Sequence, residues 1–183
     1  MDVAWGPLAG LSGTWEGDEG VDIAFGNVEG CEINTPFRER TTFNPFGPVV
    51  NGAQHLYGLD YRTAAWRAGE EDPFHTEVGY WLWDAAAGLV MRGFVVPRGS
   101  TILAGCECTA DAREFTMRAS LGSSTFGILS SPYLDGAARC TTYECTVTVH
   151  DDAFRYEETT MIDLARTGGA FKHTDCNTLK RVG

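Results

Sequence analysis

Two histidines in this chain have neighbours that could make them reactive, and the first is His75. A carboxylate, Glu77, follows it by two residues. Because side chains alternate across a strand, both would lie on one face if this segment is extended. A histidine and a carboxylate in contact can transfer protons or hold a metal ion. The pair also suits a structural hydrogen bond at the start of a strand, and a single His-x-Glu favours that simpler interpretation.

His173, the second candidate, lies in a strand-like segment near the C-terminus. It would share a face with Phe171, Asp175, Asn177 and Leu179. If that face points inward, an imidazole with polar neighbours to orient it reaches the interior, an arrangement that suits an iron ligand. If the other face points inward, His173 is exposed and has no role. Both faces mix polar and apolar residues, so the sequence leaves the two alternatives open.

Other reactive groups give weaker signals. The six cysteines are expected to be free thiols, because nothing in the sequence indicates secretion. Cys106 and Cys108 are separated by one residue, whereas zinc ligand pairs usually have about two to four residues between them. Neither a nucleophile elbow nor a phosphate-binding glycine loop is present, which disfavours ordinary hydrolase and nucleotide chemistry. No residue is assigned a catalytic role, and His55 and His150 are assigned no role of any kind.

The charge of the chain restricts its partners. A formal net charge of -11 argues against nucleic acid, because phosphate backbones are met by clustered Lys and Arg. The start, MDVAWG, has neither the basic residues nor the apolar run of a secretory signal. No stretch approaches the ~18 apolar residues of a membrane span. We therefore expect a cytoplasmic protein, monomeric or homodimeric, with neither nucleic acid nor a membrane as partner.

The elements that must position these histidines are strands. Short segments rich in Val, Thr, Tyr, Phe and Trp recur between turn signals, and few windows have helical periodicity. The candidate strands are 13–24, 36–43, 54–67, 74–84, 90–96, 101–108, 114–119, 125–129, 139–150, 154–164 and 170–182. Short turn-rich segments separate them at 44–48, 68–73, 84–88 and 150–153. Such connections favour antiparallel neighbours, since parallel crossovers need about a dozen residues or more.

These segments predict an all-β fold in one domain, residues 1–183. The expected architecture is a single closed antiparallel β-barrel of about ten strands, calycin- or lipocalin-like. Closure is preferred because the long last segment would invite aggregation as a free edge. A short helical turn is expected near the N-terminus, leading into Gly13, Trp15 and Gly17. Small residues around Trp15 would let the indole plug one end of the barrel, or simply pack in the core.

Taken together, three motifs resemble the nitrobindin family of haem-binding β-barrels, which look like fatty-acid-binding proteins. They are Gly13-Thr14-Trp15-Glu16-Gly17, then His75-Thr76-Glu77-Val78-Gly79-Tyr80, and His173 in the last strand. The resemblance spans nearly the whole chain. It implies haem b in the ferric state at the barrel mouth, with His173 as the proximal iron ligand and His75 near the distal side. The reaction it implies is isomerisation of peroxynitrite to nitrate, catalysed by a haem-dependent isomerase.

More than one function stays open at this point. The family includes members that lack the iron ligand, so a haem-free carrier of a fatty acid or other small hydrophobic ligand is the alternative. An aromatic wall of Tyr80, Trp81, Trp83 and Phe94 would line its interior. A third alternative is an interaction module whose interior is filled by its own side chains.

Overall fold

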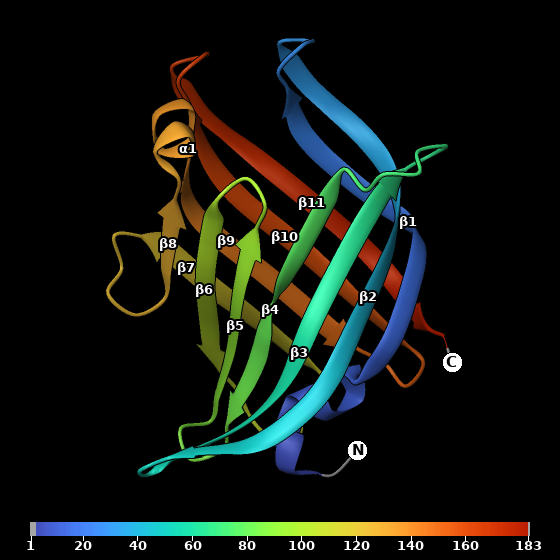
Figure 1. Ribbon diagram of the computed structural model, residues 1–183, viewed down its shortest axis with the longest axis vertical. Coiled ribbons are helices and arrows are strands. Elements are labelled where there is room, and N and C mark those ends of the chain that lie inside the picture. Colours follow the sequence, from blue (N-terminus) through green and yellow to red (C-terminus); the bar gives the residue numbers. More distant parts are fainter. Residues whose placement is uncertain (1–2, 183) are drawn as a thin grey trace.

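The strands close into a barrel in the computed structural model, which describes residues 3–182 (Figure 1). The strands are β1 (Gly13–Gly26), β2 (Cys31–Asn51), β3 (Gln54–Arg67), β4 (His75–Asp84), β5 (Leu89–Val96), β6 (Ser100–Glu107), β7 (Glu114–Leu121), β8 (Gly127–Ser130), β9 (Ala138–Val149), β10 (Ala153–Leu164) and β11 (Gly169–Arg181). Around the barrel their order is β1-β11-β10-β9-β7-β8-β6-β5-β4-β3-β2. The predicted all-β closed barrel is confirmed.

The barrel differs from the prediction in the direction of one strand. Within residues 3–182 it has eleven strands, and β8 runs parallel to β7, so the sheet is mixed rather than purely antiparallel. The strand β8 has only four residues and lies between β6 and β7, because the loop after β7 returns the chain beside its own end. A short helix, α1 (Pro132–Ala137), then leads into β9.

The predicted turn at 44–48 is wrong, because β2 continues through it to Asn51. The register against β3 shifts between Phe46 and Val49, where Gly47 and Pro48 lie. Such a bulge leaves residues outside the hydrogen-bonded ladder, and a proline can therefore be accommodated inside a strand.

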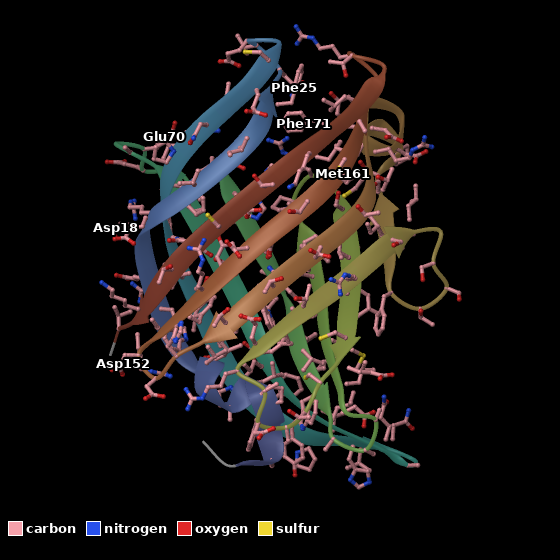
Figure 2. All side chains as sticks on the ribbon, turned by 180° about the vertical axis from the view of Figure 1, so that it is seen from behind. Asp18, Phe25, Glu70, Asp152, Met161 and Phe171 are labelled. Carbon is pink, nitrogen blue, oxygen red and sulfur yellow. The ribbon has the colours of Figure 1, made fainter. Side chains whose placement is uncertain are left out.

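The last strand closes the barrel against the first, as predicted, but only over part of its length. The pairing of β1 with β11 ends at Ile23 and Thr174, whereas β1 and β2 stay paired up to Gly26 and Cys31. Beyond this point the β1–β2 hairpin and the β10–β11 hairpin contact each other through side chains. Phe25 and Phe171 pack edge to face with their centroids 5.9 Å apart (Figure 2). The open end of the barrel lies between these hairpin tips and the start of β4.

The opposite end is closed by the N-terminal segment. A 3-10 helix covers Val3–Leu11, and its Leu8 and Leu11 are fully buried together with Trp15. The Trp15 indole donates a hydrogen bond of 2.6 Å to the Leu11 carbonyl and packs edge-on against Phe154. The predicted helical turn is confirmed, and Trp15 serves as the plug.

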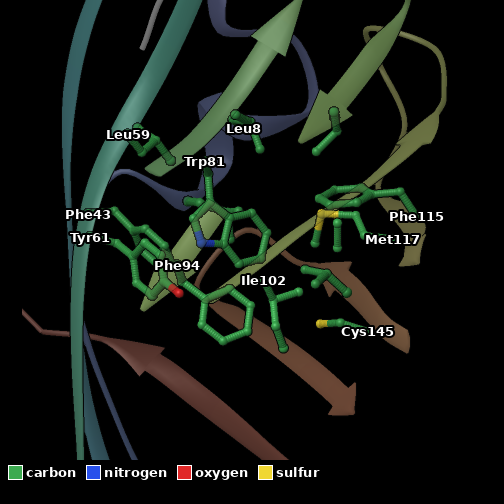
Figure 3. Packing of buried hydrophobic residues seen from close by; sticks show 14 of the residues in the cluster. Leu8, Phe43, Leu59, Tyr61, Trp81, Phe94, Ile102, Phe115, Met117 and Cys145 are labelled. Atoms are coloured by element: carbon green, nitrogen blue, oxygen red, sulfur yellow. The ribbon is translucent and has the colours of Figure 1, made fainter. Parts of the chain in front are cut away.

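Aromatic and aliphatic side chains fill the interior next to this plug (Figure 3). Trp81 meets the rings of Phe43 and Phe115, and Trp81, Trp83 and Phe94 are each 3% exposed. Tyr80 is 54% exposed, so the prediction that it lines the interior is wrong: strand alternation turns it outward while its neighbour Trp81 turns inward. The aromatic wall is therefore packed core.

Two motif glycines are required by the close approach of neighbouring strands. A Cβ on Gly79 would lie 2.1 Å from the Gly93 carbonyl oxygen, and one on Gly17 would lie 2.6 Å from the Thr178 carbonyl oxygen. Neither position has room for a side chain, because the obstructing atoms belong to the backbone. These glycines hold β4 against β5 and β1 against β11.

We expect Trp15→Ala to reduce the free energy of unfolding by about 3–5 kcal/mol, because it removes the plug and leaves a cavity. Urea unfolding measures the change. Trp66→Ala is the matched control, since that indole lies on the outside of β3, where Arg38 covers it. Equal losses for the two variants would contradict the assignment of Trp15 as the plug.

Candidate ligand site at the open end of the barrel

The side chain of His173 points into the barrel at its open end. On the same face of β11, Asn177 is 1% exposed and Leu179 is fully buried, so the odd-numbered face is the inner one. The His173 side chain is itself 29% exposed, and its Nε2 lies 2.6 Å from Oδ1 of Asp22 on β1. Within residues 3–182 its other ring nitrogen has no hydrogen-bond partner. The result is an oriented imidazole with one nitrogen available.

His75 lies across the mouth from His173. Three strands separate β4 from β11 on one side of the barrel and six on the other. The Nε2 atom of His75 is 3.1 Å from Oε1 of Glu77, and the imidazole side chain is 39% exposed. Burial lowers the pKa of His75, but Glu77, Asp175 and Glu158 outweigh it and raise the pKa overall. His75 is therefore more readily protonated than an ordinary histidine.

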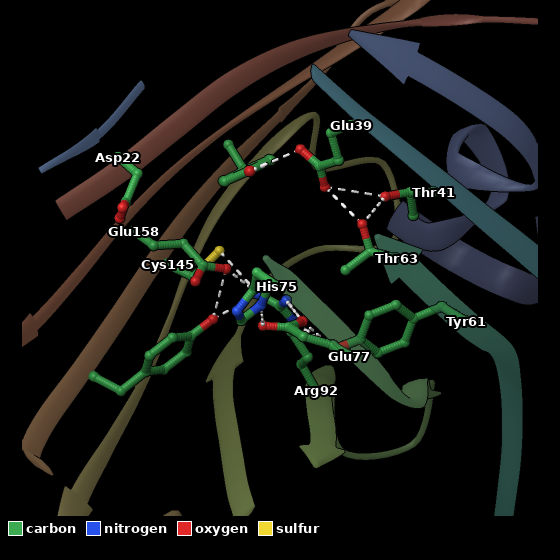
Figure 4. Close-up of polar contacts among 12 residues, drawn as sticks. Asp22, Glu39, Thr41, Tyr61, Thr63, His75, Glu77, Arg92, Cys145 and Glu158 are labelled. Atoms are coloured by element: carbon green, nitrogen blue, oxygen red, sulfur yellow. Dashed lines mark hydrogen bonds and ion pairs between the residues drawn. The ribbon is translucent and has the colours of Figure 1, made fainter. Parts of the chain in front are cut away.

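Beneath the two histidines, a buried arginine spans the barrel (Figure 4). Arg92 on β5 is 6% exposed and contacts Glu158 on β10 as well as Glu77 on β4, where the Nη2 to Oε2 distance is 2.6 Å. Tyr61 donates a hydrogen bond of 2.8 Å to Glu77, and Tyr143 donates one of 2.8 Å to Glu158. Five strands thus meet in one network, which we call the Arg92 network: Tyr61, Glu77, Arg92, Tyr143 and Glu158.

The Arg92 network lowers the pKa of Glu77. Burial alone would raise the pKa of Glu77, but Arg92, His75 and Tyr61 outweigh burial and lower the pKa to about 2. The carboxylate thus stays charged at any physiological pH. Asp175 behaves in the opposite way, since burial and the nearby charge of Glu158 raise its pKa well above the usual range.

A second polar cluster surrounds Glu39, which is 7% exposed. Its carboxylate accepts hydrogen bonds from Thr63 at 2.7 Å, Tyr156 at 2.8 Å, Thr41 at 3.1 Å and Asn177 at 3.1 Å. Burial raises the pKa of Glu39 even though these four donors act to lower it. With the Arg92 network, this cluster forms a polar floor between the apolar core and the open mouth.

The sequence motifs indicated only part of this site. They gave His75, Glu77 and His173, but not Arg92, Glu158, Glu39 or Asp22. Arg92 has one usable signal: it shares a strand face with Val90 and Phe94, and a lone arginine between apolar residues must find buried partners. His55 and His150 are exposed and lie outside the site, and the six cysteines are free.

The sequence matches the family described as "THAP4-like, heme-binding beta-barrel domain" over residues 4–181. The chain belongs to this family, the nitrobindins. The crystal structure of Rv2717c from M. tuberculosis superposes with a TM-score of 0.67 at 17% identity, over 96% of this chain and 95% of that one. Among curated proteins no sequence matches. In the part of the nitrobindin barrel that the structure describes, no helix is long and apolar enough to cross a membrane.

The donor set at the mouth fits the haem that the nitrobindin family is described as binding. A haem-ligating histidine needs one free ring nitrogen and usually holds its other nitrogen on a carboxylate or carbonyl. In His173 the carboxylate of Asp22 occupies Nε2, so the nitrogen left for iron is Nδ1, beside the ring carbon that carries Cβ; ligation through Nε2 would require that the Asp22 contact be broken. The His173 side chain lies on the inner wall and is 29% exposed.

We expect Arg92→Met to lower the free energy of unfolding by about 3–5 kcal/mol, because two buried carboxylates lose their shared cation. The triple variant Arg92→Met, Glu77→Gln, Glu158→Gln should recover most of this loss, since neutral amides still accept the tyrosine hydrogen bonds. Arg118→Met is the control: its pair with Glu144 is exposed on the outer wall and contributes under about 1 kcal/mol. Denaturant titrations measure all three. A triple variant no more stable than Arg92→Met would contradict the uncompensated charges as the cause.

Proposed function

We propose that the open end of this barrel binds ferric haem, with His173 as the axial ligand and His75 on the opposite wall. The observation that carries the proposal is the inward-facing His173 with one nitrogen on Asp22 and the other free. Membership in a haem-binding family supports it. Asp22 would fix the ring and make the nitrogen facing the iron more basic.

The arrangement favours haem over the alternative, a long-chain lipid carrier. A fatty-acid carrier needs an apolar space deep in the barrel. Here the rings that would line such a space, Trp81, Trp83 and Phe94, are packed core, and polar side chains lie between them and the mouth. A flat group at the mouth requires no deep cavity, and it is the mouth that carries the histidines.

Titration of haemin into the purified protein tests the proposal. We expect a Soret shift in the wild-type protein that His173→Ala abolishes and that Asp22→Asn weakens by about 10–100-fold in affinity. His150→Ala is the control, because that histidine is exposed at the end of β9. If His173→Ala and the wild-type protein give the same spectrum, His173 is not the ligand.

We also propose the reaction that the resemblance implies, isomerisation of peroxynitrite to nitrate. The bound haem would supply the redox-active iron, while the protein provides the axial histidine and, in His75, a second histidine at the mouth whose pKa is raised by Glu77. In stopped-flow measurements, peroxynitrite should decay faster with haem-loaded protein than with haem-free protein. Haem-loaded His150→Ala should give the same rate as the haem-loaded wild-type protein. Nitrate yield should rise in parallel. Decay that is no faster than with free haemin would argue against the reaction while leaving haem binding intact.

A further inference from the structure

The orientation of His75 is determined by a carboxylate that cannot move freely. Glu77 uses Oε1 for His75 Nε2 at 3.1 Å and Oε2 for both Arg92 at 2.6 Å and Tyr61 at 2.8 Å. Rotating the Glu77 side chain would break its buried ion pair with Arg92. This would cost more free energy than the same rotation of an exposed carboxylate, because it would leave buried charges unpaired. A half-exposed imidazole is thus attached to a rigid, buried anchor.

The anchor also determines which nitrogen of His75 is available. With Nε2 held by Glu77, Nδ1 has no hydrogen-bond partner among the residues that the structure describes. The carboxylates that act on the ring are Glu77 on its own strand and Glu158 on β10, and Asp175 on β11 also faces it, although burial and Glu158 raise the pKa of Asp175 well above the usual range and so favour its neutral form. Glu77 and Glu158 favour the protonated imidazole, in which Nδ1 carries a hydrogen and can only donate.

Arg92 cannot take this role itself. Its guanidinium donors are engaged by Glu77, Glu158, Tyr61 and Tyr143, and the side chain is 6% exposed. Of Arg92 and His75, the two basic side chains that Glu77 holds, His75 is therefore the one that keeps a free nitrogen toward the mouth.

Resting on the proposed function, we propose that Glu77, anchored by Arg92 and Tyr61, is a positioning residue that fixes His75 as a hydrogen-bond donor to a small inorganic anion bound beside the haem. His75 would touch the anion, and Glu77 would act only through His75. In this arrangement the ion pair between Arg92 and Glu77 keeps the Glu77 carboxylate in place.

The first experiment uses the haem-free protein and nitrogen-15 NMR of the histidine rings. Glu77→Gln should lower the pKa of His75, because the carboxylate that stabilises the charged ring is gone, and should release the ring from its single tautomer. Glu158→Gln removes a carboxylate of the same network that does not touch His75, so it should lower the pKa less and leave the tautomer unchanged. Glu144→Gln, on the outer wall, should change neither. An unaltered pKa and tautomer in folded Glu77→Gln would overturn the role of Glu77.

The second experiment measures azide affinity of the haemin-loaded protein over a pH range in which azide stays anionic. The wild-type protein should bind azide more tightly at low pH, where His75 is charged, and lose this advantage as pH rises through the pKa of His75. His75→Phe should weaken binding at low pH by about 10–100-fold, as expected for loss of a hydrogen bond to a charged group. In Glu77→Gln the midpoint of the pH dependence should move to lower pH.

The outcomes separate this inference from the proposed function. A normal, His173-dependent Soret band with the same azide affinity in His75→Phe and wild type would refute the anion contact alone. A protein without a His173-dependent Soret band would refute haem binding and the anion contact together, and the NMR result would still decide whether Glu77 positions His75.

Discussion

The ion pairs of Arg92 with Glu77 and Glu158 are the interaction on which the organisation of this barrel depends. The pair with Glu77 joins the neighbouring strands β5 and β4, whereas the pair with Glu158 reaches β10 across the interior. Burying three charges is costly unless each is paired and hydrogen-bonded. The tyrosines Tyr61 and Tyr143 each donate a further hydrogen bond to one of the two carboxylates.

This network divides the interior into two parts with different properties. On the side of the 3-10 helix, Trp15 and the Trp81 cluster form a packed core that holds the strands together. On the other side the inner wall is polar, and a cluster around Glu39 extends the boundary from β2 and β3 to β10 and β11. The buried apolar packing therefore lies toward the closed end, and the polar, partly exposed groups lie toward the open end.

The strand pattern could be predicted from the sequence because its signals are local. Alternation and turn residues located nearly every strand, and the glycines of the motifs marked places where backbones touch. Three features could not be predicted this way. The segment 125–129 was predicted as a strand, but the parallel direction of β8 depends on how a loop packs. The continuation of β2 past Pro45 and Pro48 depends on a bulge, and the inner face of β11 depends on the whole barrel's register. For the site, local motifs found the two histidines, whereas the partners of Arg92 lie 15 and 66 residues away.

The acidity of the mouth bears on which state of a bound haem this barrel would favour. Asp22 contacts His173, and Glu158 lies on the adjoining inner wall, while Arg92 is already neutralised by two carboxylates. Hydrogen bonding of a ligating histidine to a carboxylate makes it a stronger donor, and negative surroundings stabilise the more positive oxidation state of a metal. Both effects favour ferric over ferrous iron. The same surroundings oppose anions at the mouth, so a protonated His75 held by Glu77 is the feature that would let a small anion bind there.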